Sequence, residues 1–204
     1  MRLENFNAAA MNYVLYQNDI QHSIDCERYP LKEMPRRIFL DTSIINLLAK
    51  CHAHVFERVP IPISMNLTRA LDLEALMHVF YTGYRAPWEL ICSAKTLEEL
   101  GKTKPQDLRD ELVEFGIDFV LKVRANDTRQ FNLEFGQSYR SSPLPDENDR
   151  ELIQNAIALQ CDVFCTSDRR TIVRKRDKLR NLPLRILTPE EWWAHVKPWA
   201  ALWG

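Results

Sequence analysis

Short apolar runs that alternate with helix-forming segments constrain the fold of this chain more than any other feature. Runs such as IFL and VFC are short and rich in β-branched and aromatic residues, so we predict strands there. The predicted strands cover residues 37–40, 88–94, 119–123, 162–166 and 183–187. The predicted helices cover residues 43–51, 67–82, 147–160 and 170–180, parts of 96–115 with a break near Pro105, and a segment that begins at Thr188. Strands separated by helices indicate an α/β fold with a mostly parallel sheet covered on both faces.

The length and composition of the chain fit one sizeable globular domain. It has 204 residues, of which 46% are hydrophobic and 27% charged. With only 5 glycines, it lacks the flexible linker that would separate two domains. We therefore expect one domain over residues 36–204, preceded by an extension over residues 1–35 with a helix near 7–24 that packs on the core.

The net charge and the cysteines bear on partners and location. The formal net charge is -1, so composition alone gives no reason to expect nucleic acid or a membrane as a partner. The five cysteines are odd in number, and some lie in strand-like runs, which indicates reduced thiols. No stretch has the length and apolarity of a signal peptide core or a membrane span, so we expect a cytoplasmic protein without a membrane partner.

Four acidic residues are expected at one edge of the sheet. Asp41 and Asp168 each directly follow a predicted strand, and the carboxyl ends of parallel neighbours lie at the same edge. Glu99 lies one turn into a helix that begins after strand 88–94. Asp149 continues the apolar stripe of its helix toward the N-terminus, so an acid points inward where the pattern would place leucine.

Each acid also has a structural explanation. Asp41 and Asp168 could cap the helices that follow them. Thr96 and Glu99 have the spacing of a capping box, and Asp149 would favour the positive end of its own helix. Both interpretations stay open at the level of sequence.

Carboxylates that meet at one site repel one another, so the protein must protonate some of them or bind a cation. A set with oxygen ligands alone suits hard ions such as Mg²⁺ or Mn²⁺, which act on phosphate esters. The sequence therefore predicts a metal-binding catalytic site made by four residues: Asp41, Glu99, Asp149 and Asp168.

At these residues the chain resembles the PIN domain family of metal-dependent nucleases. The resemblance runs from about Arg36 to Trp193. The matching motifs are IFLDTSIINLL with Asp41, Ser93 to Leu100 with Glu99, Asp149 to Ala156, CTSD with Asp168, and the ending RILTPEEWW.

The resemblance implies a three-layer α/β/α sandwich with a central, mostly parallel sheet. It also implies that the four acids hold one or two Mg²⁺ or Mn²⁺ ions and activate water to cut RNA, leaving a 5′-phosphate and a 3′-hydroxyl. Hydroxyl residues that flank two of the acids would support the metal and its waters as outer ligands: Thr42, Ser43, Thr166 and Ser167.

Many stand-alone bacterial members of that family are toxins neutralised by a small protein, so an antitoxin is a second expected partner besides RNA. The segments 1–35 and 51–86 have no counterpart in the compact toxins. The tryptophans at the C-terminus indicate packing of the last helix on the body or against a partner in a homodimer: Trp192, Trp193, Trp199 and Trp203.

The run RRTIVRKRDKLR at 169–180 is strongly basic. We expect Arg169, Arg170 and Arg174 to contact RNA phosphates beside the metal, which gives salt-dependent affinity without sequence choice. The alternative is a solvated helix face with the apolar residues of the run packed inward.

The sequence is also compatible with three other interpretations. A PIN-like scaffold could bind RNA or a protein partner without cutting. A haloacid dehalogenase-type phosphatase also has an Asp after its first strand, but its second Asp, two residues later, is replaced here by Ser43. The ligand types in HSIDC and CHAH suggest zinc, although their spacing matches no standard finger.

Overall fold

The computed structural model describes residues 3–83, 86, 88–102, 110, 114, 144–179 and 181–202. The chain divides into two compact units. Unit 1 consists of Met1–Met34, Cys51–Pro87 and Pro189–Gly204. Unit 2 consists of Pro35–Lys50 and Trp88–Thr188 and contains all the candidate site residues. The predicted division at residue 35 stays a prediction.

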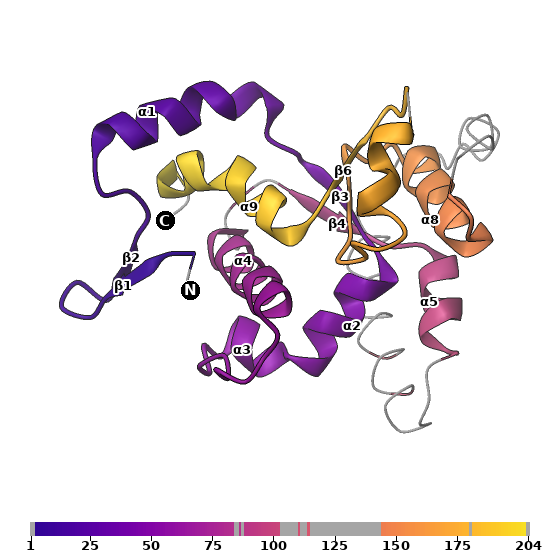
Figure 1. Cartoon of the computed structure of the whole chain (residues 1–204), viewed down its shortest axis with the longest axis horizontal. Coiled ribbons are helices and arrows are strands. Elements are labelled where there is room, and N and C mark those ends of the chain that lie inside the picture. Colours follow the sequence, from indigo (N-terminus) through magenta and orange to yellow (C-terminus); the bar gives the residue numbers. More distant parts are fainter. Residues whose placement is uncertain are drawn as a thin grey trace. The chain divides into compact units, whose positions relative to one another are not determined.

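Unit 2 contains a four-stranded sheet in which all neighbouring strands are parallel (Figure 1). The strand order is β4-β3-β5-β6. The strands are β3 (Arg37–Leu40), β4 (Glu89–Ile91), β5 (Val163–Cys165) and β6 (Arg185–Leu187). The prediction of an α/β fold with a mostly parallel sheet is therefore confirmed, and the predicted strand 119–123 lies outside the described residues.

The two central strands form the middle of the core of unit 2. Every residue of β3 and β5 is buried, because each strand has a neighbour on both sides and cover on its faces. Phe39 pairs with Phe164 in the register, and their rings stack with centroids 5.4 Å apart. The apolar stripe predicted around Leu152 and Ile157 joins this core.

The helices of unit 2 are α2 (Thr42–Lys50), α5 (Ala94–Leu100), α8 (Glu147–Ala158) and the 3₁₀ helix η2 (Val173–Lys178). The first three lie where helices were predicted, and most of the predicted segment 96–115 beyond Lys102 is outside the described part. The helix predicted over 170–180 is wrong in type and extent. Turns occupy its beginning, and Arg176 reaches across to donate to the Ile186 carbonyl at 3.2 Å.

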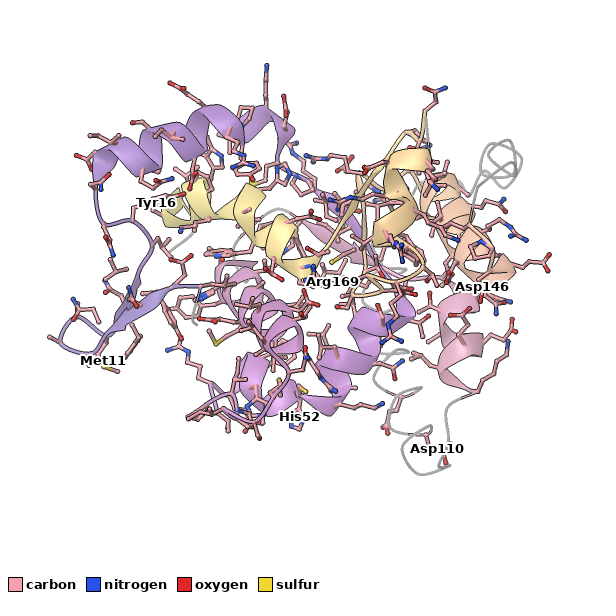
Figure 2. All side chains as sticks on the ribbon, viewed as in Figure 1. Met11, Tyr16, His52, Asp110, Asp146 and Arg169 are labelled. Carbon is pink, nitrogen blue, oxygen red and sulfur yellow. The ribbon has the colours of Figure 1, made fainter. Side chains whose placement is uncertain are left out.

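The N-terminal part of unit 1 differs from the prediction. Instead of a helix over 7–24, a hairpin of β1 (Asn5–Asn7) and β2 (Asn12–Val14) precedes α1 (Asp19–Arg28). The Asn7 side chain accepts the N–H groups of Ala9 and Ala10 at 3.1 and 3.2 Å and so fixes a turn. Met11, in the loop between the strands, has a positive φ of 52° (Figure 2).

Hydrogen bonds within unit 1 join its N-terminal segment to its C-terminal one. Its other helices are η1 (Leu31–Glu33), α3 (His52–Phe56), α4 (Leu67–Gly83), α9 (Pro189–Val196) and η3 (Lys197–Leu202). Trp199 Nε1 donates to the Tyr29 carbonyl at 2.8 Å, and Trp193 Nε1 donates to Glu4 at 3.2 Å. The predicted packing of these tryptophans on the body is therefore confirmed for both. Within the described ranges, no helix has the length and apolarity that crossing a bilayer requires.

Candidate active site

The ends of β3 and β5 bring two of the predicted acids to one edge of the sheet. Leu40 and Cys165 are register partners, and the Asp41 N–H donates to the Cys165 carbonyl at 3.0 Å. Residues that follow the two strands therefore start side by side. This is the arrangement on which the predicted proximity of Asp41 and Asp168 depended.

Asp41 is a buried carboxylate bound by hydroxyls. Its side chain is 4% exposed, and Oδ2 accepts from both Ser43 Oγ and Thr166 Oγ1 at 2.6 Å. Burial raises the pKa of Asp41 above its ordinary value of 3.8, and the charge of Glu99 raises it further. The two hydroxyls and the N–H of Thr42 act in the opposite direction.

The capping explanation fits only the backbone of Asp41. Its carbonyl accepts the first amide bonds of α2, from Ile44 at 3.0 Å and Ile45 at 3.2 Å. A capping side chain would bind the second or third amide of the helix. The carboxylate of Asp41 binds hydroxyls and the first amide instead.

Three of the predicted outer residues, Ser43, Thr166 and Ser167, are linked by hydrogen bonds into a cluster. Ser43 Oγ accepts the Ser167 N–H at 3.0 Å, and Thr166 Oγ1 accepts the Asp168 N–H at 3.0 Å. The Ser167 hydroxyl is buried and has no partner among the described residues. The cluster therefore joins the start of α2 to the end of β5.

Glu99 reaches the same edge from α5. Its Oε2 accepts the hydroxyl of Thr42 at 2.7 Å. The capping-box explanation for Glu99 is wrong, because α5 starts earlier than predicted and the box is formed by Ser93 and Thr96. Glu99 therefore lies beyond the first turn of the helix.

Asp149 lies in the first turn of α8, as its structural explanation required. Asp146 caps this helix by accepting the Asn148 N–H at 2.8 Å (Figure 2). The pKa of Asp149 is raised to about 6, first by burial and then by the charges of Asp146, Asp41 and Asp168. The negative charges of two other predicted acids, Asp41 and Asp168, therefore contribute to the raised pKa of Asp149.

Asp168 is held by its own turn and caps no helix, because the 3₁₀ helix η2 begins only after Ile172. Its Oδ1 accepts the N–H groups of Arg170 and Thr171, both at 2.9 Å. The Thr171 hydroxyl donates to Oδ2 of the same carboxylate. Sequence reasoning missed Thr171, although the Asp-x-x-Thr spacing resembles the capping motifs that would have revealed it.

The predicted RNA-binding arginines lie in the segment that follows. Arg170 and Arg174 are exposed, whereas Arg169, which is labelled in Figure 2, is partly buried. Ile172 is buried in the core, as the alternative of an inward apolar face required. An exposed cation beside the acids is compatible with both interpretations, and phosphate contact stays a prediction.

Within the described residues, ion pairs leave the charge of the four acids unbalanced. In the part of the chain that the structure describes, none of them pairs with an Arg, Lys or His side chain. All four offer carboxylate oxygens, the ligands that Mg²⁺ and Mn²⁺ prefer. In donor chemistry and charge, these residues fit a hard divalent ion.

The residues do not form a ready-made coordination shell. Among the described residues, no group of three or more His, Cys, Asp or Glu side chains is placed to hold a metal ion. Hydroxyls occupy Asp41 Oδ2, and turn amides occupy Asp168 Oδ1. The same finding gives the zinc suggestion no support, and His22 Nε2 instead donates to the Pro198 carbonyl at 2.9 Å.

Comparisons with models of protein families, with curated proteins and with solved structures found no match to this chain. Any functional assignment therefore depends on the residues and contacts described above.

Proposed function

We propose that the protein is a Mg²⁺- or Mn²⁺-dependent endoribonuclease of the PIN type. The observation that carries the proposal is the buried Asp41 carboxylate, which has hydroxyl partners and acidic neighbours but no described cation beside it. A bound divalent ion would relieve that repulsion and keep the carboxylate ionised.

The proposal assigns distinct roles to the residues at the sheet edge. Asp41, Glu99, Asp149 and Asp168 would hold the ion or ions. When bound, the metal would lower the pKa of a water and stabilise charge on the phosphate. Ser43 and Thr166 keep Asp41 in one orientation, and Arg170 and Arg174 would bind the RNA backbone.

The parallel sheet of unit 2 supports the PIN assignment, because the resemblance implies a central, mostly parallel sheet. We also propose that helices cover both faces of this sheet in a three-layer α/β/α sandwich. The expected antitoxin and homodimer partners depend on that assignment too. A toxin role predicts that a small protein encoded beside this one would inhibit the cleavage.

Cleavage of a structured RNA with Mn²⁺ or with EDTA tests the proposal. We expect cleavage with Mn²⁺ alone, and its loss in Asp41→Asn. A matched control is Asp162→Asn, which changes an acid at the opposite end of β5, where its side chain accepts the amides of Arg36 and Arg37. Equal cleavage by the parent and Asp41→Asn would refute the assignment.

A second candidate function is a PIN-like scaffold that binds RNA or a protein without cutting. It is favoured by the absence, among the described residues, of a preassembled metal group. Calorimetry separates the two candidates, because a silent scaffold would show no Mn²⁺ affinity that depends on Asp41.

A further inference from the structure

One polar face of α8 reaches the first turn of α5. Glu151 and Asn155 are four residues apart and so lie on the same face of their helix. Glu151 pairs with Lys95 Nζ at 3.0 Å, and Asn155 Nδ2 donates to Ser93 Oγ at 3.2 Å. The two helices lie side by side in unit 2 (Figure 1). We call these residues the α5–α8 brace: Ser93, Lys95, Glu151 and Asn155.

The contact between Asn155 and Ser93 is shielded from solvent. Asn155 and Ser93 are each 8% exposed, although Asn155 stands between apolar residues of the core stripe. Ser93 is also the N-cap of α5, so the bond from Asn155 fixes the point where that helix begins. A buried polar pair is poor at adding stability but good at selecting one arrangement.

Lys95 is held between the two helices. Its side chain is only 13% exposed and also pairs with Glu98 at 3.4 Å. The hydrogen bond to Glu151 is the main reason that the pKa of Lys95 is raised. The ammonium group of Lys95 therefore forms an ion pair that links α5 to α8.

The brace joins the two helices that carry two of the proposed metal-binding residues. Glu99 follows Lys95 by one helical turn on α5, and Asp149 precedes Glu151 by two residues on α8. We propose that the α5–α8 brace is a set of positioning residues that fixes Glu99 relative to Asp149. This inference rests on the proposed metal-dependent function.

A positioning residue is recognised by an effect on metal binding that is larger than its effect on folding stability. An ion pair with a partly exposed partner contributes little to folding. Metal ligation is far stricter, because Mg²⁺ requires near-octahedral geometry at about 2.0–2.1 Å. A shift of α5 too small to unfold the protein would therefore weaken metal binding.

Lys95→Met and Lys102→Met form a matched pair that tests the brace. Both lysines pair with Glu98, Lys102 at 2.7 Å, but only Lys95 also pairs with α8. Electrostatics alone predicts that losing either positive charge tightens Mn²⁺ binding. The brace predicts the opposite for Lys95→Met, a loss of about 10-fold in Mn²⁺ affinity by calorimetry.

Two further variants sharpen the result. Lys95→Arg keeps the charge and the reach, so we expect near-parental Mn²⁺ affinity. Asn155→Ala changes no charge and is expected to weaken Mn²⁺ binding in the same direction as Lys95→Met. Circular dichroism checks that each variant is folded.

The outcomes separate the brace from the function on which it rests. If Lys95→Met and Lys102→Met bind Mn²⁺ equally well while Asp41→Asn has lost binding, the brace is wrong and the metal site stands. If Asp41→Asn binds Mn²⁺ and cuts RNA like the parent, the proposed function itself is wrong.

Discussion

The segments that follow β3 and β5 have similar sequences but hold their acids differently. Asp41 is buried and bound by hydroxyls, one of which comes from the neighbouring strand end. Asp168 is bound by the amides and hydroxyl of its own turn. The carboxylate of an Asp at a strand end can therefore be bound by residues distant in the sequence or by its own turn. The sequence motif alone does not distinguish these two cases.

Among the substitutions that test this comparison, Asp41→Asn is expected to have the largest effect on RNA cleavage. Replacing it with Asn removes the charge to which the hydroxyls of Ser43 and Thr166 donate, and we expect RNA cleavage with Mn²⁺ to fall about 10³-fold. A radiolabelled RNA and single-turnover conditions give the rate. A loss below tenfold would remove Asp41 from the chemistry.

Asp168→Asn should have a smaller effect on cleavage, about 10²-fold, with little change in stability. Asn caps turns and helices almost as well as Asp, so the local bonds survive while the charge is lost. Thermal unfolding and cleavage measured on the same sample separate the two roles. Unchanged cleavage would leave Asp168 as a turn residue only.

Thr166→Val tests the hydroxyl that distinguishes Asp41 from Asp168. Thr166 is fully buried, and its loss leaves a buried carboxylate with one fewer donor. We expect about 1–3 kcal/mol of destabilisation by urea unfolding and about 10-fold slower cleavage. Thr166→Ser keeps the hydroxyl and should restore most of both losses.

Asp149→Asn should stabilise the metal-free protein in a pH-dependent way. The folded-state pKa is raised from 3.8 to about 6, so the cost of ionising Asp149 is absent below pH 3.8, grows as the pH rises and is complete above about 6. A fully buried site would give about 3 kcal/mol. Solvent reaches part of this side chain, so we expect about 1–2 kcal/mol.

Urea unfolding in EDTA at pH 4 and pH 7.5 measures this effect. The exposed Asp177, replaced with Asn, is the control for removing one negative charge. A stabilisation by Asp149→Asn that is equal at both pH values would contradict a raised pKa.

The smallest expected effects are at the exposed arginines. In an Asp41→Asn background with EDTA, Arg170→Ala or Arg174→Ala should weaken RNA binding a few-fold and reduce the salt slope by about 1. Fluorescence polarisation over a range of salt gives both values, with Lys32→Ala in unit 1 as the control. A change no larger than that of the control would favour a solvated surface.

The sequence was sufficient to predict much of the sheet but not the N-terminal hairpin. Runs such as IFL and VFC are apolar at every position, which is typical of strands in the interior of a sheet that is covered on both faces. The alanines before Met11 favour a helix by propensity, yet the side chain of Asn7 holds that stretch in a turn. A single local hydrogen-bonding residue overrode the propensity of its neighbours.

The site was predictable in its acids and not in their partners. Strand ends and helix faces are local patterns, so the acids could be expected at one edge. The hydroxyl of Thr166 that binds Asp41 lies 125 residues away, and Asn155 reaches Ser93 across 62 residues. Such pairings are set by packing, and no local pattern encodes them.

Mn²⁺ titration by calorimetry in two buffers of different ionisation enthalpy tests the central claim most directly. At pH 6 the parent protein should bind Mn²⁺ and release at least about half a proton, because the ion displaces the proton that Asp149 holds when metal is absent and any that the buried Asp41 holds. Asp41→Asn should lose this binding, whereas Asp162→Asn should keep it. No Mn²⁺ binding by the parent, or equal binding by Asp41→Asn, would contradict the account.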